Sequence, residues 1–191
     1  MRKAVPFAEL LRTNPTLYES RQENELPFIP ASVSEPLTLD QLEWHTIVPV
    51  LPPADPPVEA HAFDLPTLLA LPQPAQTTWE LTAFHSPMAI NEPPRPYYPK
   101  TALGVDAATG MILAFQLAAP DQTLAQTAAL SLIQSILASG CRPAVIKMDS
   151  INLIRALEPL ANALGAKLLQ AKVLPRANEA RRSLEAFTSR A

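Results

Sequence analysis

TALGVDAATGMILAFQLA, residues 101–118, is the stretch that decides the fold. Its first residues form a short apolar run that ends at Asp106, and a second apolar run begins at Met111. Runs of this length, bounded by Asp and Gly, favour buried or half-buried strands over helices. Gly110 can take the positive φ that a tight turn often needs, and the Asp106 carboxylate can accept hydrogen bonds from the amides of that turn. We therefore predict a β-hairpin here.

A third strand is predicted before the hairpin, over residues 77–85. Its sequence, TTWELTAFH, places Trp79, Leu81 and Ala83 on one face and Glu80, Thr82 and Phe84 on the other. This alternation is the period of a strand, and most of these residue types favour strands. A proline-rich connection, residues 87–99, joins this strand to the hairpin.

Helices and strands are predicted to alternate after the hairpin. The segments are a helix from Asp121, as its N-cap, to Gly140, a strand over 143–149, a helix that ends at Gly165, a strand over 167–173 and a helix that opens at Pro175. Pro159 must kink or restart the second of these helices. The predicted order is βββαβαβα. This order implies a mixed sheet, antiparallel first and parallel later, with helices on its faces.

The periodicity also predicts which side of each helix faces the sheet. In the first helix the inner face is Ala125, Ala128, Ala129, Leu132, Ile133, Ile136 and Leu137, and the outer side is Gln126, Thr127, Gln134 and Ser135. In the last helix Ala177, Ala180, Leu184 and Phe187 point inward, and Arg181, Arg182 and Glu185 point outward. Asp149 or Ser150 is expected to cap the middle helix, with Asp149 as the favoured cap.

The chain before this domain differs in composition. We predict two parts, a proline-rich, acidic N-terminal arm over 1–76 and an α/β domain over 77–191. The arm holds 13 of the 22 prolines, and each proline lacks the amide that a central strand needs. Short helices are expected within residues 1–20, over 37–44 with Ser34 or Thr38 as cap, and over 63–71.

Composition restricts the classes of function. The chain is 48% hydrophobic and 17% charged, which suits a globular protein. Its single cysteine excludes an intramolecular disulfide and a cysteine zinc site, and fits the cytoplasm. No secretory signal or membrane-spanning apolar run is recognisable. Residues 79–191 carry 11 basic and 8 acidic side chains. This balance is too small to indicate nucleic-acid binding on charge alone.

The element order resembles the ribonuclease H-like fold of ribonuclease H, retroviral integrases and many transposases. In sequence, the chain more closely resembles a bacterial, cyanobacterial-type domain family of unknown function. The shared features are Trp79, Val105-Asp106, Gly110, Pro120, Arg142-Pro143 and Leu174-Pro175. This second resemblance implies a fold and no activity.

The nuclease resemblance would imply clustered carboxylates that hold two divalent metal ions. Asp149 stands at the end of the fourth predicted strand, as that resemblance requires. The first strand offers Glu80 near its start, Asp106 lies in the hairpin turn, and Glu179 or Glu185 would supply a third acid. The triad is incomplete, so an active nuclease that uses Mg²⁺ or Mn²⁺ is the alternative rather than the main prediction.

The main prediction is a non-catalytic binding or scaffold domain with a protein partner and no cofactor. Arg176, Arg181 and Arg182 make the C-terminal helix the most basic part of the chain. They form either a solvated helix face or a surface for an acidic partner.

Overall fold

A computed structural model describes residues 4–14, 16, 25–30, 32–33, 36–48, 54–86, 90 and 96–188, without the side chains of 4–6, 185, 187 and 188. The chain divides into two compact units, Met1–Pro53 and Ala54–Ala191. Val58 and Leu68 are buried in the core of the second unit. The predicted extents of the two parts, 1–76 and 77–191, stay a prediction.

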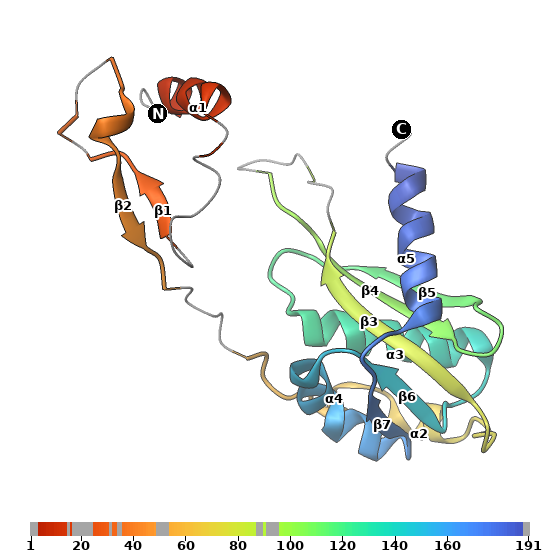
Figure 1. Cartoon of the computed structure of the whole chain (residues 1–191). Helices are drawn as coiled ribbons and strands as arrows, with labels where there is room; N and C mark the ends of the chain where they lie inside the picture. Colours follow the sequence, from red (N-terminus) through yellow and green to blue (C-terminus); the bar gives the residue numbers. More distant parts are fainter. Residues whose placement is uncertain are drawn as a thin grey trace. The chain divides into compact units, whose positions relative to one another are not determined.

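The first unit contains a helix and a small sheet (Figure 1). Helix α1 is Ala4–Thr13, within the segment where a short helix was predicted. Strands β1 (Glu25–Phe28) and β2 (Glu43–Thr46) pair antiparallel, with Pro27 opposite Trp44. A two-stranded sheet has no central strand, so it tolerates this proline.

The prediction of a helix over 37–44 was wrong. Only the 3₁₀ turn η2, Leu39–Gln41, is helical, and Glu43–Thr46 forms a strand. Thr38 does cap the turn, and its amide donates to the Gln41 Oε1 at 2.9 Å. The turn ends at once because Trp44 and Thr46 favour extended backbone and pair with β1.

The second unit contains a five-stranded mixed sheet in the order β5-β4-β3-β6-β7. The strands are β3 (Thr78–His85), β4 (Lys100–Asp106), β5 (Ile112–Leu117), β6 (Val145–Met148) and β7 (Lys167–Gln170). Strands β3, β4 and β5 are antiparallel neighbours, and β6 and β7 run parallel to β3. This confirms the predicted mixed sheet and the ribonuclease H-like order of elements.

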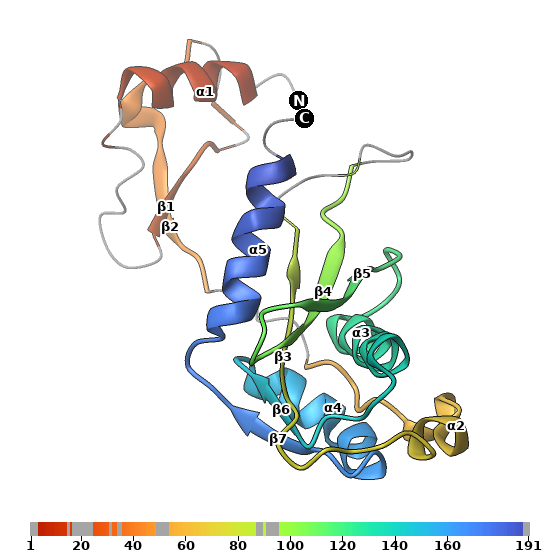
Figure 2. The ribbon, with the colours of Figure 1, turned by 90° about the vertical axis from the view of Figure 1, so that its right-hand side faces the viewer.

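Helices cover both faces of this sheet (Figures 1 and 2). Helices α3 (Leu124–Ser139) and α4 (Ile151–Ala163) pack on one face, and α5 (Pro175–Thr188) packs on the other, over β3 and β4. The larger core lies beneath α3 and α4 around Trp79, Leu132 and Leu157. A smaller cluster lies beneath α5. Its buried members are Leu103, Val105, Leu174, Ala177 and Ala180.

The segment before β3 packs against the α3 and α4 side of this unit. It contains the 3₁₀ turn η3 (Ala60–Ala62) and helix α2 (Leu65–Leu69), which confirms a helix within 63–71. The Val58 amide donates to the Ala156 carbonyl of α4 at 2.7 Å, and Asp55 accepts from the Ala125 amide of α3 at 2.8 Å. Residues 55–58 therefore link the two helices.

One predicted cap was wrong, since helix α3 is capped by Thr123 rather than Asp121. Of the two caps predicted for α4, Ser150 is the one that forms, and the favoured Asp149 is not. Thr123 forms a capping box with Gln126, because its hydroxyl accepts from the Gln126 amide while the Gln126 side chain accepts from the Thr123 amide. Helix α4 runs through Pro159 as one element, so this proline does not restart it.

The predicted faces of α3 need one correction. Leu137 is 55% exposed, whereas Thr127 and Ser135 are fully buried. For Ser135 the cause is Gly104 of β4, which allows a close approach of the helix to the sheet. A Cβ at Gly104 would collide with the Ser135 hydroxyl. The small residues of α3 therefore face the sheet there, and the larger Leu137 faces solvent.

The faces of α5 are mostly as predicted. Ala177 and Ala180 are buried, and Leu184 packs against their cluster. Arg181 does not point into solvent alone, since its guanidinium lies 4.4 Å from the centre of the Phe84 ring. Phe187 and Glu185, for which orientations were predicted, lie outside the described side chains.

Candidate functional site

Glu80 is a buried acid in the middle of the sheet. It is 2% exposed and lies opposite Val105 of β4 and Lys147 of β6. Its Oε2 accepts a hydrogen bond from the Ala177 amide of α5 at 2.8 Å. The first amides of a helix have no partner within the helix, and an anion there also interacts favourably with the helix dipole. Glu80 therefore caps α5 from a distant strand.

Leu174 and Pro175 explain why this cap comes from the sheet. Leu174 immediately precedes α5 and has no polar side chain, while Pro175 at the first helical position has no amide. The Asn178 amide already donates to the Leu174 carbonyl. The Ala177 amide thus requires a partner from outside the helix, and the Glu80 carboxylate supplies it through a charge-assisted hydrogen bond.

Asp106 has the turn role that the sequence predicted. Its Oδ1 accepts from the amides of Ala108 and Thr109, at 3.1 and 2.7 Å, and from the Thr109 hydroxyl at 2.8 Å. Gly110 has φ of 77° and completes the turn. One oxygen of this carboxylate is therefore occupied by the hairpin itself.

Asp149 and Glu179, the remaining acids of the nuclease hypothesis, are exposed. Asp149 follows β6 and precedes the cap Ser150, while Glu179 lies on α5, where it forms an ion pair with Arg176 at 3.4 Å. Within the described ranges, no three His, Cys, Asp or Glu side chains are grouped so that they could hold a metal ion. The contacts found here assign Glu80 and Asp106 structural roles.

The three basic residues of α5 have different surroundings. Arg176 pairs with Glu179 and lies over the hairpin turn, since a Cβ at Gly110 would be 3.5 Å from Arg176 Cδ. Arg181 stacks on Phe84, and the Arg182 Nε donates to the Asn178 carbonyl at 3.3 Å. Arg176 and Arg182 are exposed, and Arg181 is half-buried.

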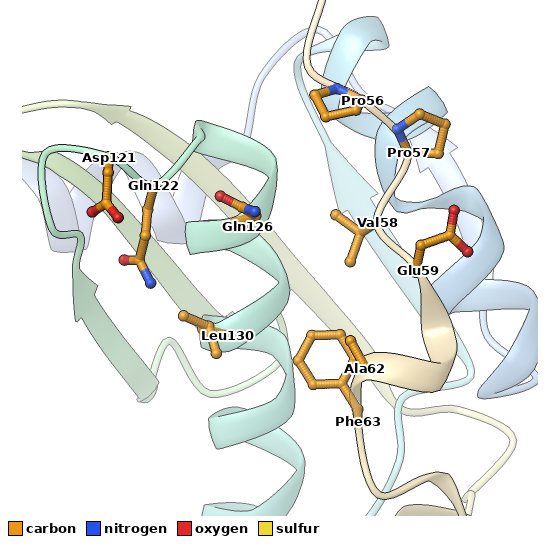
Figure 3. A pocket seen from close by; sticks show the side chains of 10 residues that line it. All are labelled: Pro56, Pro57, Val58, Glu59, Ala62, Phe63, Asp121, Gln122, Gln126 and Leu130. Carbon is orange, nitrogen blue, oxygen red and sulfur yellow. The ribbon is translucent and has the colours of Figure 1, made fainter.

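A pocket of about 450 Å³ lies between residues 56–63 and the N-terminal half of α3 (Figure 3). Its apolar lining includes Val58, Phe63 and Leu130. In Figure 3 the Phe63 ring and the Leu130 side chain face each other across the opening. A concave site of this volume with apolar walls is typical of a binding pocket.

Polar side chains surround this apolar part. They are Glu59, Asp121, Gln122 and Gln126. Glu59 and Asp121 are exposed acids, and the lining contains no lysine or arginine. The Gln122 and Gln126 side chains are oriented by accepting hydrogen bonds from the Ala119 and Thr123 amides. The rim of the pocket is therefore anionic and partly preorganised.

Sequence reasoning missed this pocket because it assigned residues 56–63 to the arm. One signal was readable, and one was not. The pair Thr123 and Gln126 has the spacing of a capping box, which marks where α3 begins. Asp55 has no capping role in its own segment, and its partner Ala125 lies 70 residues later, so only the structure reveals the pairing.

The fold and pocket define a mixed α/β domain with a ribonuclease H-like order of elements and a pocket on its α3 side. Residues 64–185 match the model of DUF6930, a domain of unknown function, and the chain belongs to this family. No curated protein is similar enough to match this chain.

Three solved structures illustrate the likeness in fold. The catalytic core domain of BIV integrase is 16% identical, with a TM-score of 0.41 over 60% of this chain and 72% of that chain. The HTLV-2 integrase catalytic core domain in complex with magnesium, in its dimeric form, is 16% identical, with a TM-score of 0.39 over 58% and 68%. Endonuclease V from Bacillus subtilis is 16% identical, with a TM-score of 0.30 over 64% and 50%.

The part of the chain that the structure describes contains no helix with the length and apolarity needed to cross a membrane.

Proposed function

We propose that this chain is a non-catalytic protein-binding domain, and that its pocket between residues 56–63 and α3 takes a short segment of a partner protein. The observation that carries the proposal is the combination of apolar walls at Val58, Phe63 and Leu130 with an anionic rim at Glu59 and Asp121. The partner segment would place an apolar side chain between the walls and a lysine or arginine at the rim.

The surroundings of the pocket support binding without a large rearrangement. Val58 is 7% exposed and fixed to α4 through its amide, and Asp55 holds the neighbouring backbone to α3. Both walls are therefore attached to the same core, which lowers the cost of ordering the site when a partner binds. An apolar wall with half-buried Phe63 and Leu130 beside an acidic rim is complementary to a basic, amphipathic peptide.

The contacts of the candidate acids agree with a role other than catalysis. Glu80 is occupied by the Ala177 amide, and Asp106 is occupied by its own turn. The basic residues Arg176, Arg181 and Arg182 remain proposed as a second contact surface for a partner with acidic side chains.

Selection from a library of short peptides displayed on phage tests the pocket. We expect wild type to enrich peptides in which an apolar residue is adjacent to lysine or arginine. Glu59→Lys should weaken such a peptide by about tenfold, which corresponds to ~1.4 kcal/mol, and Leu130→Glu should abolish binding by placing a charge in the apolar wall.

Glu158→Lys is the matched control, because it makes the same charge change on an exposed position of α4 outside the pocket lining. It should bind the selected peptide like wild type. Peptides that bind Glu59→Lys and Leu130→Glu as tightly as wild type would overturn the assignment of the pocket, and so would a selection without enrichment.

A further inference from the structure

The side-chain oxygens of the two glutamines in the pocket are already used within the protein. Gln122 Oε1 accepts from the Ala119 amide at 3.1 Å, and Gln126 Oε1 accepts from the Thr123 amide at 2.8 Å. A backbone amide can only donate, so the oxygen of each side chain, and not its nitrogen, must face that amide. These contacts therefore fix which end of each side-chain amide is occupied.

The Nε2 groups of both glutamines are available to a bound molecule. Among the described residues, the side chains of Gln122 and Gln126 make no hydrogen bonds other than these two. Both line the pocket, and Figure 3 shows the Gln126 nitrogen on the side of the opening. Each Nε2 carries two N–H bonds. The α3 side of the pocket therefore offers donors to carbonyl oxygens, while Glu59 and Asp121 offer acceptors to a cation.

The opposite wall of the pocket cannot pair with a strand. Pro56 and Pro57 have no amide, and the Val58 amide donates to the Ala156 carbonyl of α4. A peptide that adds to a sheet as a further strand needs both backbone donors and backbone acceptors on the edge that it joins. Residues 56–58 supply no donor, so this wall excludes recognition by strand addition.

A helical peptide matches the glutamine donors poorly as well. In a helix nearly every backbone carbonyl accepts from the amide four residues later, so few carbonyls remain for the protein. A polyproline II segment has no internal hydrogen bonds, and its carbonyls are fully accessible. Aromatic side chains commonly line the grooves that bind such segments, and Phe63 lines this pocket.

We propose that the ligand of the pocket is a polyproline II segment in which prolines flank an apolar residue and a lysine or arginine. This inference rests on the proposed function and names the class of its ligand. The apolar residue would lie between Phe63 and Leu130. Carbonyls of the segment would accept from Gln122 and Gln126, and its cation would lie at the anionic rim.

Two further phage libraries, presented to the full chain, test the class of ligand. In one, prolines alternate with random residues, which favours polyproline II, and in the other, alanines replace these prolines, which favours a helix. We expect binders from the proline library, each with an apolar residue and lysine or arginine, and none from the alanine library. Binders that come equally from the alanine library, or only from it or the fully random library, would overturn the inference and leave the proposed function standing. An absence of binders from all three libraries would overturn the proposed function itself.

Gln126→Glu tests the donor. Glutamate can still accept from the Thr123 amide, so the capping box is kept and Tm should not fall. The variant replaces the Nε2 donor with a second oxygen, which would face a carbonyl of the ligand. A synthetic peptide selected from the proline library should therefore bind about tenfold more weakly. Gln134→Glu, the same change at an exposed position of α3 outside the pocket lining, is the control and should bind like wild type.

The sign of this change distinguishes a donor from a contribution to the charge of the rim. If Gln126 contributed no hydrogen bond, the added carboxylate would strengthen the binding of a basic peptide. Equal or tighter binding by Gln126→Glu, together with weaker binding by Glu59→Lys, would overturn the polyproline II inference and retain the peptide-binding pocket. Weaker binding by Gln126→Glu, with Gln134→Glu unchanged, would support the inference.

Discussion

The Glu80 carboxylate of strand β3 caps helix α5 by accepting a hydrogen bond from the Ala177 amide at 2.8 Å, across 97 residues of sequence. This contact connects the centre of the sheet to the last helix. It also explains a charged residue that is 2% exposed, since a buried charge is tolerated when it is hydrogen-bonded.

We predict that Glu80→Ala lowers the free energy of unfolding by about 2–3 kcal/mol, because it leaves the Ala177 amide buried without its acceptor. Glu80→Gln should cost less, about 1 kcal/mol, since its amide oxygen can still accept the bond without the charge. Urea denaturation measures both. Glu158→Ala, on the exposed side of α4, is the control and should change stability by less than about 0.5 kcal/mol. If Glu80→Ala changed the free energy of unfolding as little as Glu158→Ala does, the capping role of Glu80 would be contradicted.

A second prediction concerns the close approach of α3 to β4. Gly104→Ala should destabilise the domain by about 1–3 kcal/mol, because the added Cβ would collide with the Ser135 hydroxyl oxygen. In the double variant with Ser135→Ala, the nearest remaining atom at that position is the Ser135 Cβ, at 3.4 Å, which is an ordinary contact. The double variant should therefore recover much of the stability that Gly104→Ala loses.

A double-mutant cycle measures this coupling by chemical denaturation of wild type, both single variants and the double variant. The sign of the interaction energy is the test. If the effects of Gly104→Ala and Ser135→Ala simply add, the glycine is required for a reason other than the hydroxyl.

The hairpin turn and the close approach of α3 to β4 illustrate what the sequence could and could not predict. The turn was predictable because the partners of Asp106 are two and three residues away. The burial of Ser135 could not be predicted, because helical periodicity ranks residues by polarity. It has no information on where a glycine in the facing strand lets the helix come close.

The helix caps also include one that the sequence could predict and one that it could not. Asp121 was preferred as a cap because it follows Pro120, yet the local pair Thr123 and Gln126 satisfies the α3 amides. That error was avoidable, since the capping box is a sequence pattern. The cap of α5 was not predictable, because the acceptor lies in β3 and only the folded sheet brings it to the helix.

A third prediction concerns Arg142, one of the residues by which the sequence resembled its family. Its Nη1 donates to the Leu164 carbonyl at the end of α4 at 2.7 Å, and its Nε donates to the Leu71 carbonyl at 3.1 Å. The side chain therefore joins the C-terminal end of α4 to the segment that follows α2, and a cation is favoured at this end of a helix.

Arg142→Met should lower the free energy of unfolding by about 2 kcal/mol, because two part-buried carbonyls lose a charged donor. Arg142→Lys should recover only part of this, since an ammonium group cannot reproduce the fork geometry of the guanidinium. Arg155→Met, at an exposed position of α4, is the control and should be nearly neutral. Thermal denaturation distinguishes the three. Equal stability of Arg142→Met and Arg155→Met would mean that these hydrogen bonds contribute nothing.

The fourth prediction separates the binding domain from the metal-dependent nuclease. Ser150 caps α4 with its side chain, accepting from the Leu153 amide, while Asp149 is exposed. Ser150→Ala should therefore lower the free energy of unfolding by about 1 kcal/mol, whereas Asp149→Ala should leave it within about 0.5 kcal/mol of wild type.

Thermal melting at increasing Mg²⁺ and Mn²⁺ is the accompanying measurement. For a non-catalytic domain we expect no specific rise in Tm, because a ligand raises Tm only when it binds the folded state preferentially. A rise in wild type that Asp149→Ala removes and Ser150→Ala retains would establish a metal site at Asp149 and favour the nuclease instead.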